Sequence, residues 1–142
     1  MGDVGQEEVE EVDFVPVVKR LKRPRGGVNF GWNSFEGSRR YAPGPAPGHV
    51  PPVVEHSHDG GACSITGGYV IRDRSLGALY GAYVYGDLCD SRLRIARLSA
   101  GGARGGRALG PRVSTLVSFG EDGRGRVHAM SLEGAVFRLA PK

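Results

Sequence analysis

The chain has 142 residues, which fits one domain of ordinary size, and 39% of them are hydrophobic. Its 24 glycines punctuate short apolar runs, which is typical of an ordered protein built from short strands and turns rather than of a disordered one. The formal net charge is +4, but only five of the 19 basic residues fall in one run, Lys19 to Arg25, and the aromatic residues lie inside strand patterns, so we expect no nucleic-acid partner.

The N-terminal segment is acidic and lacks the apolar core of a signal peptide. No apolar run approaches the length of a transmembrane helix, so we expect no membrane span. If Met1 is the true start, the chain is expected to stay in the cytoplasm. An acidic cluster in this segment could supply metal ligands, but a solvated acidic face is more typical; it comprises Glu7, Glu8, Glu10 and Glu11.

Strand patterns recur along the first half of the chain, whereas helical spacing is absent. Residues 12–18 are apolar and β-branched, with Pro16 indicating an edge or a bulge, and residues 28–32 form a short aromatic run. Residues 39–61 are rich in Pro, Gly and His and predict a long loop with a brief extended stretch at 53–54. His56 and His58 in this segment lack the spacing of a zinc site, and His58 is expected to cap or line a loop.

Two strand-like runs, residues 63–72 and 78–89, flank a turn and predict a hairpin centred on Leu76. In this register Tyr69 lies opposite Tyr83, and Cys63 lies opposite Cys89. Because side chains alternate along a strand, one face would carry the cysteines together with Tyr69, Ile71, Tyr83 and Tyr85. The register would also bring the two cysteines within disulfide range.

Further strands are predicted over residues 91–98, 113–119, 126–131 and 134–139, with a flexible Gly/Arg/Ala-rich loop over 99–110. That loop lacks the Lys-Ser/Thr ending of a phosphate-binding loop. Short strands at roughly ten-residue spacing indicate an all-β sandwich, barrel or propeller. Since a propeller blade takes roughly 40–50 residues, a propeller of this length would have about three blades, the first of them incomplete.

Six short motifs resemble, in order, the β-propellers of glucose/sorbosone dehydrogenase-like proteins. They are Gly2–Gln6 with Glu10–Asp13, Asn29–Trp32 with Glu36-Gly37, Ser64–Val70, Tyr83–Asp87, Ser118–Asp122 and Gly134–Leu139. The resemblance implies a partial β-propeller, about three blades of a six-bladed ring. Its parts would be an incomplete blade over 1–41, a Pro/Gly-rich loop over 42–61, a hairpin blade over 62–100 and a last blade over 111–140.

The resemblance also implies a chemistry for the complete domain. Enzymatic members of the family oxidise sugars by hydride transfer from a hydroxyl-bearing carbon to pyrroloquinoline quinone (PQQ), with calcium bound beside it. Gly5 and Gln6 align with the stretch whose backbone carbonyls bind that calcium, and Arg72 takes the position of a basic residue near the quinone carboxylates. The catalytic histidine belongs to an earlier blade and has no counterpart here, so we expect this chain alone to be inactive.

One further expectation follows from the resemblance and one from the residues themselves. The family is exported, which favours a disulfide between Cys63 and Cys89. Asp87 and Asp122 are expected to act as turn and strand-end residues rather than as acid–base catalysts.

Two alternatives to a dehydrogenase fragment stay open. The same motifs occur in the propellers of Hedgehog-interacting-protein-like proteins, which are not known as enzymes, so the chain could be a non-catalytic module that binds a protein or a glycan. It could also be a truncated relic without function. In each case half a ring would leave blade faces exposed, which predicts self-association.

Overall fold

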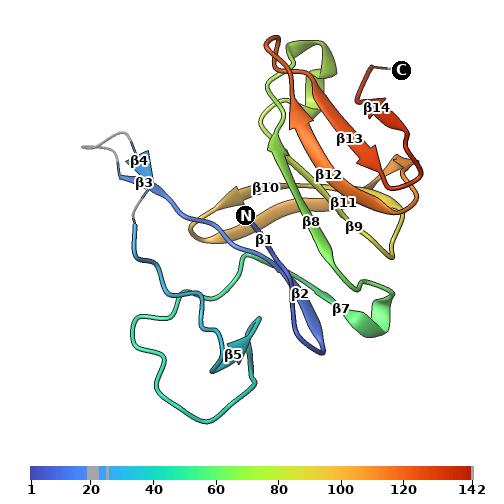
Figure 1. The fold of residues 1–142 in the computed structure, drawn as a ribbon. Coiled ribbons are helices and arrows are strands. Elements are labelled where there is room, and N and C mark those ends of the chain that lie inside the picture. Colours follow the sequence, from blue (N-terminus) through green and yellow to red (C-terminus); the bar gives the residue numbers. More distant parts are fainter. Residues whose placement is uncertain (19–22, 25, 142) are drawn as a thin grey trace.

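The computed structural model describes residues 1–18, 23–24 and 26–141, and these form an all-β arrangement of separate antiparallel sheets, none of which is closed (Figure 1). Four members of the basic run, Lys19, Arg20, Lys22 and Arg25, lie outside the described residues. Within the part that is described, no helix is long and apolar enough to cross a membrane.

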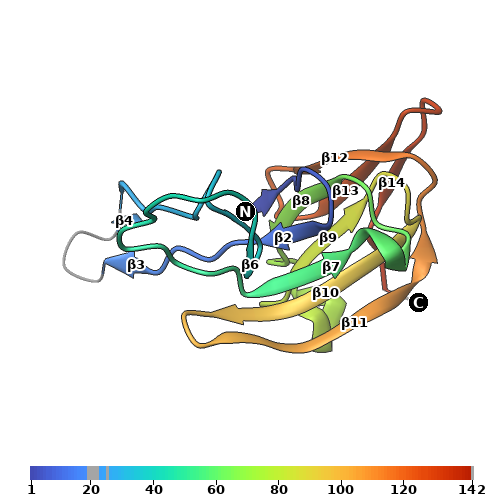
Figure 2. The ribbon, with the colours of Figure 1, turned by 90° about the horizontal axis from the view of Figure 1, so that it is seen from below.

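The first sheet has three strands in the order β1-β2-β7: β1 (Gly2–Asp3), β2 (Val9–Val12) and β7 (Val54–Ser57). The strand predicted over 12–18 was therefore wrong in its bounds, because β2 ends at Val12 and β3 (Val17–Val18) is a separate strand that pairs with β4 (Arg23–Pro24). Seen from below, β3 and β4 lie to one side of the larger sheets (Figure 2).

Between β4 and β7 the backbone is mostly irregular. β5 (Phe35–Glu36) pairs with β6 (Arg39–Arg40), and the short 3-10 helix η1 (His58–Gly60) follows β7. The strand predicted over 28–32 does not form. In its place a single bridge joins Asn29 to His49.

The second sheet has four strands in the order β11-β10-β9-β8: β8 (Ile65–Val70), β9 (Tyr83–Asp87), β10 (Arg92–Ser99) and β11 (Gly102–Arg112). The 3-10 helix η2 (Arg74–Leu79) joins β8 to β9. The loop predicted over 99–110 was wrong, because most of it is β11. Hydrogen-bonded pairing with β10 overrides the weak strand preference of its glycines.

The third sheet contains β12 (Leu116–Glu121), β13 (Val127–Ser131) and β14 (Val136–Arg138). Its strands agree with the predicted ones to within a few residues. Among the described residues β14 pairs only with β13, and two of its apolar side chains, Val136 and Phe137, are exposed.

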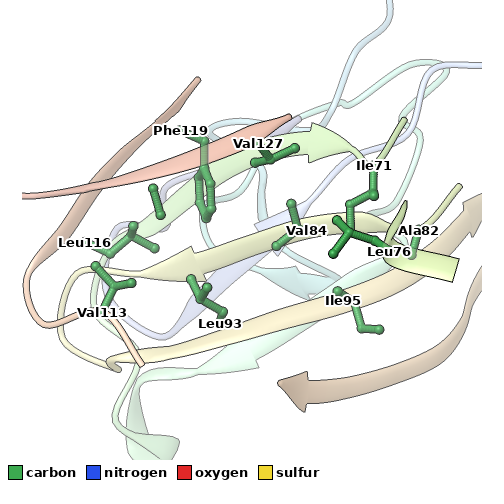
Figure 3. Packing of buried hydrophobic residues seen from close by; sticks show 11 residues of the cluster. Ile71, Leu76, Ala82, Val84, Leu93, Ile95, Val113, Leu116, Phe119 and Val127 are labelled. Atoms are coloured by element: carbon green, nitrogen blue, oxygen red, sulfur yellow. The ribbon is translucent and has the colours of Figure 1, made fainter. Parts of the chain in front are cut away.

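Within the four-stranded sheet, strand β9 is buried on both faces and supplies side chains to each of two cores. Val84 enters the core between this sheet and the third one, where Phe119 and Val127 face it (Figure 3). Tyr83 and Tyr85 enter a second core, together with Val12 of the first sheet. All five residues of β9 are buried, so this strand is the centre of the described fold.

A bulge in β8 changes the predicted hairpin. Thr66 pairs with Gly86 in the predicted register, but Tyr69 pairs with Val84 instead of Tyr83. Tyr69 therefore packs into the opposite core from Tyr83 and Tyr85, and the predicted shared face was wrong. The bulge requires glycine at position 68, because a Cβ there would overlap the carbonyl oxygen of Val84.

The register before the bulge is the predicted one, and it brings the cysteines together. Ile65 pairs with Asp87, and two residues further out a disulfide joins Cys63 to Cys89 with a Cα–Cα distance of 5.6 Å. The bond ties the start of β8 to the end of β9.

Removing the disulfide should destabilise the fold. For cysteines 26 positions apart, loss of the cross-link in a Cys63→Ser/Cys89→Ser variant should cost about 3 kcal/mol of unfolding free energy in the chain-entropy model. Urea unfolding of the oxidised chain and of the double variant measures the difference. An unchanged midpoint would show that the cross-link constrains neither the folded nor the unfolded state. As a control, reductant should leave the double variant unchanged, because it has no disulfide.

Candidate functional site

The loop between β1 and β2 is organised around a single carboxylate oxygen. Glu36 Oε1 accepts hydrogen bonds from four successive backbone N–H groups, at 3.0 Å from Gln6, 2.8 Å from Glu7, 2.7 Å from Glu8 and 2.9 Å from Val9. Such a nest of N–H groups is a favourable site for an anion. The burial of Glu36 by itself raises its pKa, but the four donors outweigh burial, and the pKa is lowered.

This anchoring fixes the direction of the loop carbonyls. In a planar trans peptide the N–H and the C=O point in opposite directions. Since the N–H groups of Gln6 and Glu7 point at Glu36, the carbonyl oxygens of Gly5 and Gln6 point away from it. Among the described residues, neither oxygen accepts a hydrogen bond. Gly5 is needed here because a Cβ would overlap the carbonyl oxygen of Val9.

Glu10 braces the same loop from inside the protein. Its side chain is fully buried, and Oε2 accepts from the backbone N–H of Ile65 at 2.7 Å and from that of Gly5 at 3.4 Å. Oε1 lies 2.7 Å from Nε2 of His58, whose Nδ1 lies 2.9 Å from the carbonyl oxygen of Glu7. The bond to Glu10 raises the pKa of His58. His58 thus lines the loop as the sequence predicted.

The acidic cluster is not one solvated face, contrary to the sequence prediction. Glu7 and Glu8 are exposed, but Glu10 and Glu11 are buried because β2 is the central strand of its sheet. No local pattern in the sequence indicates this burial. A strand with the pattern VEEV satisfies neither an alternating nor a continuous apolar rule.

Glu11 and Asp13 are buried without full hydrogen bonding. Glu11 Oε2 and both carboxylate oxygens of Asp13 have no partner among the described residues. Burial, with the negative charges of Asp13 and Asp3 nearby, raises the pKa of Glu11 to about 7. Burial and the charge of Asp3 raise the pKa of Asp13 to about 6. Both groups therefore stay protonated at pH values well above the usual pKa of a carboxyl group.

Arg72 lies far from this loop. It follows the far end of β8, where Nη1 lies 3.4 Å from Oε1 of Glu121. Gly5 lies near Ile65 at the start of β8, because the backbone N–H groups of both residues donate to Oε2 of Glu10. Five residue steps from Ile65 to Val70 span about 16 Å at the usual strand rise, so the structure does not bring Arg72 and the Gly5–Gln6 carbonyls together.

The other polar candidates have structural partners. Asp87 is buried and accepts from the backbone N–H groups of Cys63, Ser64, Cys89 and Asp90. Asp122 accepts from the backbone of Arg126 and Arg124, which lowers its pKa to about 2. Both carboxylates hold turns, as predicted.

No metal ligand set is formed by the histidines. In the described part of the chain, the one group of close potential ligands is Cys63, Asp87 and Cys89, and its cysteines are joined in the disulfide.

Comparison with known proteins finds a partial similarity. No family model matches the chain. It is 35% identical over 100 residues to the HIPL1 protein of Arabidopsis thaliana, a match that covers 61% of this chain. The chain spans only 13% of that protein's length.

Neutralising Glu36 should loosen the loop. A Glu36→Gln variant keeps an acceptor oxygen but loses the charge that strengthens four N–H bonds, so it should lose roughly 1–3 kcal/mol of stability at pH 7. Because the pKa of Glu36 is lowered on folding, the difference should shrink as the pH falls below about 4. The control is Glu133→Gln at an exposed side chain, which should change stability by less than about 0.5 kcal/mol.

The buried acids should make stability fall with rising pH. The unfolded chain releases these protons near pH 4, whereas the folded chain holds those of Asp13 and Glu11 to about 6 and 7. Folded protein therefore binds more protons in this window and loses stability from about pH 4 to 7. A Glu11→Gln/Asp13→Asn variant should flatten this slope and be more stable at pH 8, by on the order of 1 kcal/mol. Urea midpoints at pH 5 and 8 measure it, and an unchanged slope would contradict the assignment.

Proposed function

We propose that this chain is part of a β-propeller of the glucose/sorbosone dehydrogenase-like type, and that its role there is to present a calcium-binding loop. The observation that carries the proposal is the nest around Glu36, which turns the carbonyls of Gly5 and Gln6 outward. The succession of three antiparallel sheets of three or four strands along the chain supports a propeller arrangement.

The loop suits a hard cation. Calcium prefers oxygen ligands and accepts backbone carbonyls in flexible geometry. The carbonyl oxygens of Gly5 and Gln6 have no competing donors among the described residues, and the exposed carboxylates of Glu7 and Glu8 lie in the same loop. Glu36 contributes by holding the backbone in place, without contacting the ion itself.

A hollow of about 320 Å³ beside the same end of β8 could admit a small ligand. It is lined by residues 64–67, by Leu88, and by residues 116–119 at the start of β12. The backbone and the hydroxyl groups of Ser64, Thr66 and Ser118 give this hollow its polar character.

The residues present do not fit one quinone. A single cofactor cannot meet both Arg72 and the Gly5–Gln6 carbonyls across the length of β8, and Arg72 already has a carboxylate partner in Glu121. PQQ, when bound to the enzymes that this chain resembles, accepts a hydride from the sugar. We propose that sugar oxidation is a property of the complete domain, to which this chain brings neither the catalytic histidine nor a contact from Arg72.

A non-catalytic propeller module that binds a protein or a glycan is the second candidate. The position of Arg72 favours it, because the predicted quinone contact is not assembled in this half of the domain. The open edge of β14, with Val136 and Phe137 exposed, supports the predicted self-association. The disulfide favours an oxidising compartment for either candidate.

Calcium titration of the 142-residue chain tests the proposal. Isothermal calorimetry should detect one Ca²⁺ per chain, and Glu36→Gln should weaken binding at least several-fold because the carbonyls are no longer held. Glu133→Gln is the matched control and should bind as the parent does. Absence of Ca²⁺ binding at millimolar concentration would overturn the calcium loop.

The enzymatic part of the proposal needs a separate measurement. The longest natural protein that contains this chain, loaded with PQQ and calcium, should reduce an artificial electron acceptor in the presence of glucose. If calcium binds but no sugar is oxidised, the non-catalytic module is the better description.

A further inference from the structure

Three arginines line one pocket at the other end of the four-stranded sheet. Arg97 of β10 and both Arg104 and Arg107 of β11 line a pocket of about 200 Å³. Nη2 of Arg97 donates to the carbonyl oxygen of Ala78 in η2 at 3.1 Å, which places the pocket at the end of β8 that Arg72 follows. It is thus separate from the loop at Gly5 and Gln6.

A bulge in β11 places the three arginines on one face of the sheet. Arg97 pairs with Arg104, but Ile95, two residues earlier, pairs with Arg107, three residues later. β11 therefore has one extra residue at Gly105–Gly106, and Gly105 has a φ of 66° that favours glycine. In a regular strand Arg104 and Arg107 would face opposite sides. With the extra residue both share the face of Arg97, because directly paired residues lie on the same side of a sheet.

The three guanidinium groups have no carboxylate partner among the described residues. Other arginines of the same region are paired, since Arg92 and Arg94 bind Asp90 and Arg126 binds Asp122. The remaining pocket wall is small and apolar, formed by Ala78, Ala82, Ile95, Ala96 and Gly105. Positive charges that share one pocket repel each other, and an anion between them would remove that repulsion.

We propose that this pocket binds a tetrahedral oxyanion, sulfate or phosphate, either free or as the ester group of a small sugar. The planar guanidinium fork donates paired hydrogen bonds to two oxygens of such a group. A pocket of this size suits a compact group. None of its lining residues is aromatic, so the stacking platform of a nucleic-acid strand is missing. The inference does not depend on the proposed calcium loop.

Calorimetric titration of the 142-residue chain with sodium sulfate and sodium phosphate at low ionic strength tests the pocket, with sodium chloride as the reference. Both tetrahedral anions should bind, and Arg104→Gln or Arg107→Gln should each weaken binding about tenfold through loss of a charge-assisted contact. Glucose 6-sulfate and glucose 6-phosphate distinguish the sources. Tighter binding than the free anions identifies a sugar ester, and equal binding identifies the free anion.

Arg112→Gln is the matched control. Arg112 is an exposed arginine of the same strand, donates to Ser91, and pairs with Arg92, whereas Arg107 pairs with Ile95. The variant removes the same charge and should bind the anions like the parent. Because Arg104 and Arg107 are exposed, far-UV circular dichroism and thermal unfolding should match the parent for all three variants.

Three results would overturn the proposal. The first is no binding of either anion while the chain is folded by circular dichroism. The second is an equal loss in Arg112→Gln and Arg104→Gln, which would reflect net charge alone. The third is a DNA duplex that displaces sulfate and binds more tightly than every sugar ester, which would make the surface a polyanion site.

Discussion

The described structure depends on burying strand β9 of the four-stranded sheet on both faces. Strand β9 does this with the alternation of Tyr83, Val84 and Tyr85, which sends one side chain into the core beneath the third sheet and two into the core beneath the first. A strand buried on both faces cannot shift by a single residue without exchanging its whole set of core contacts. The first and third sheets are therefore positioned through their packing against opposite faces of this one.

The supply of hydrogen bonds decides how the buried acidic residues in and near the first sheet behave. Glu36 is kept ionised by four backbone N–H donors. One oxygen of Glu11 and both oxygens of Asp13 lack a donor among the described residues, and these two groups hold their protons instead. These buried carboxylates thus fall into two classes, and the difference lies in the supply of hydrogen bonds rather than in depth of burial.

The two ends of β8 differ in chemistry. At its start the bonds to Glu36 and Glu10 hold a loop whose free carbonyls suit a cation. Beyond its far end, three arginines share a pocket that suits an anion. Both arrangements use backbone irregularity, a tight glycine-containing loop in one case and a bulge in the other, to direct groups that a regular strand would have aimed elsewhere. The length of β8 keeps the two from acting on one small ligand.

The sequence by itself determined the all-β class, most of the later strands and the hairpin register that joins Cys63 to Cys89, because these depend on local apolar runs, turn residues and the two-residue period of a strand. It also determined that His58, Asp87 and Asp122 serve loops and turns, since each stands beside glycine or other turn-forming residues.

Only the tertiary structure decided the rest. The bulges at Gly67–Gly68 and Gly105–Gly106 each reverse the face of the sheet on which the following side chains lie. A glycine pair permits such a bulge without requiring one. Strand β11 exists because β10 offers it hydrogen bonds, although its own residues favour a loop. The burial of Glu10 and Glu11 and the anchoring by Glu36 arise between segments that lie up to 55 residues apart. Interactions of that range leave no local pattern in the sequence, which is why the candidate site could be named only by resemblance before the structure assembled it.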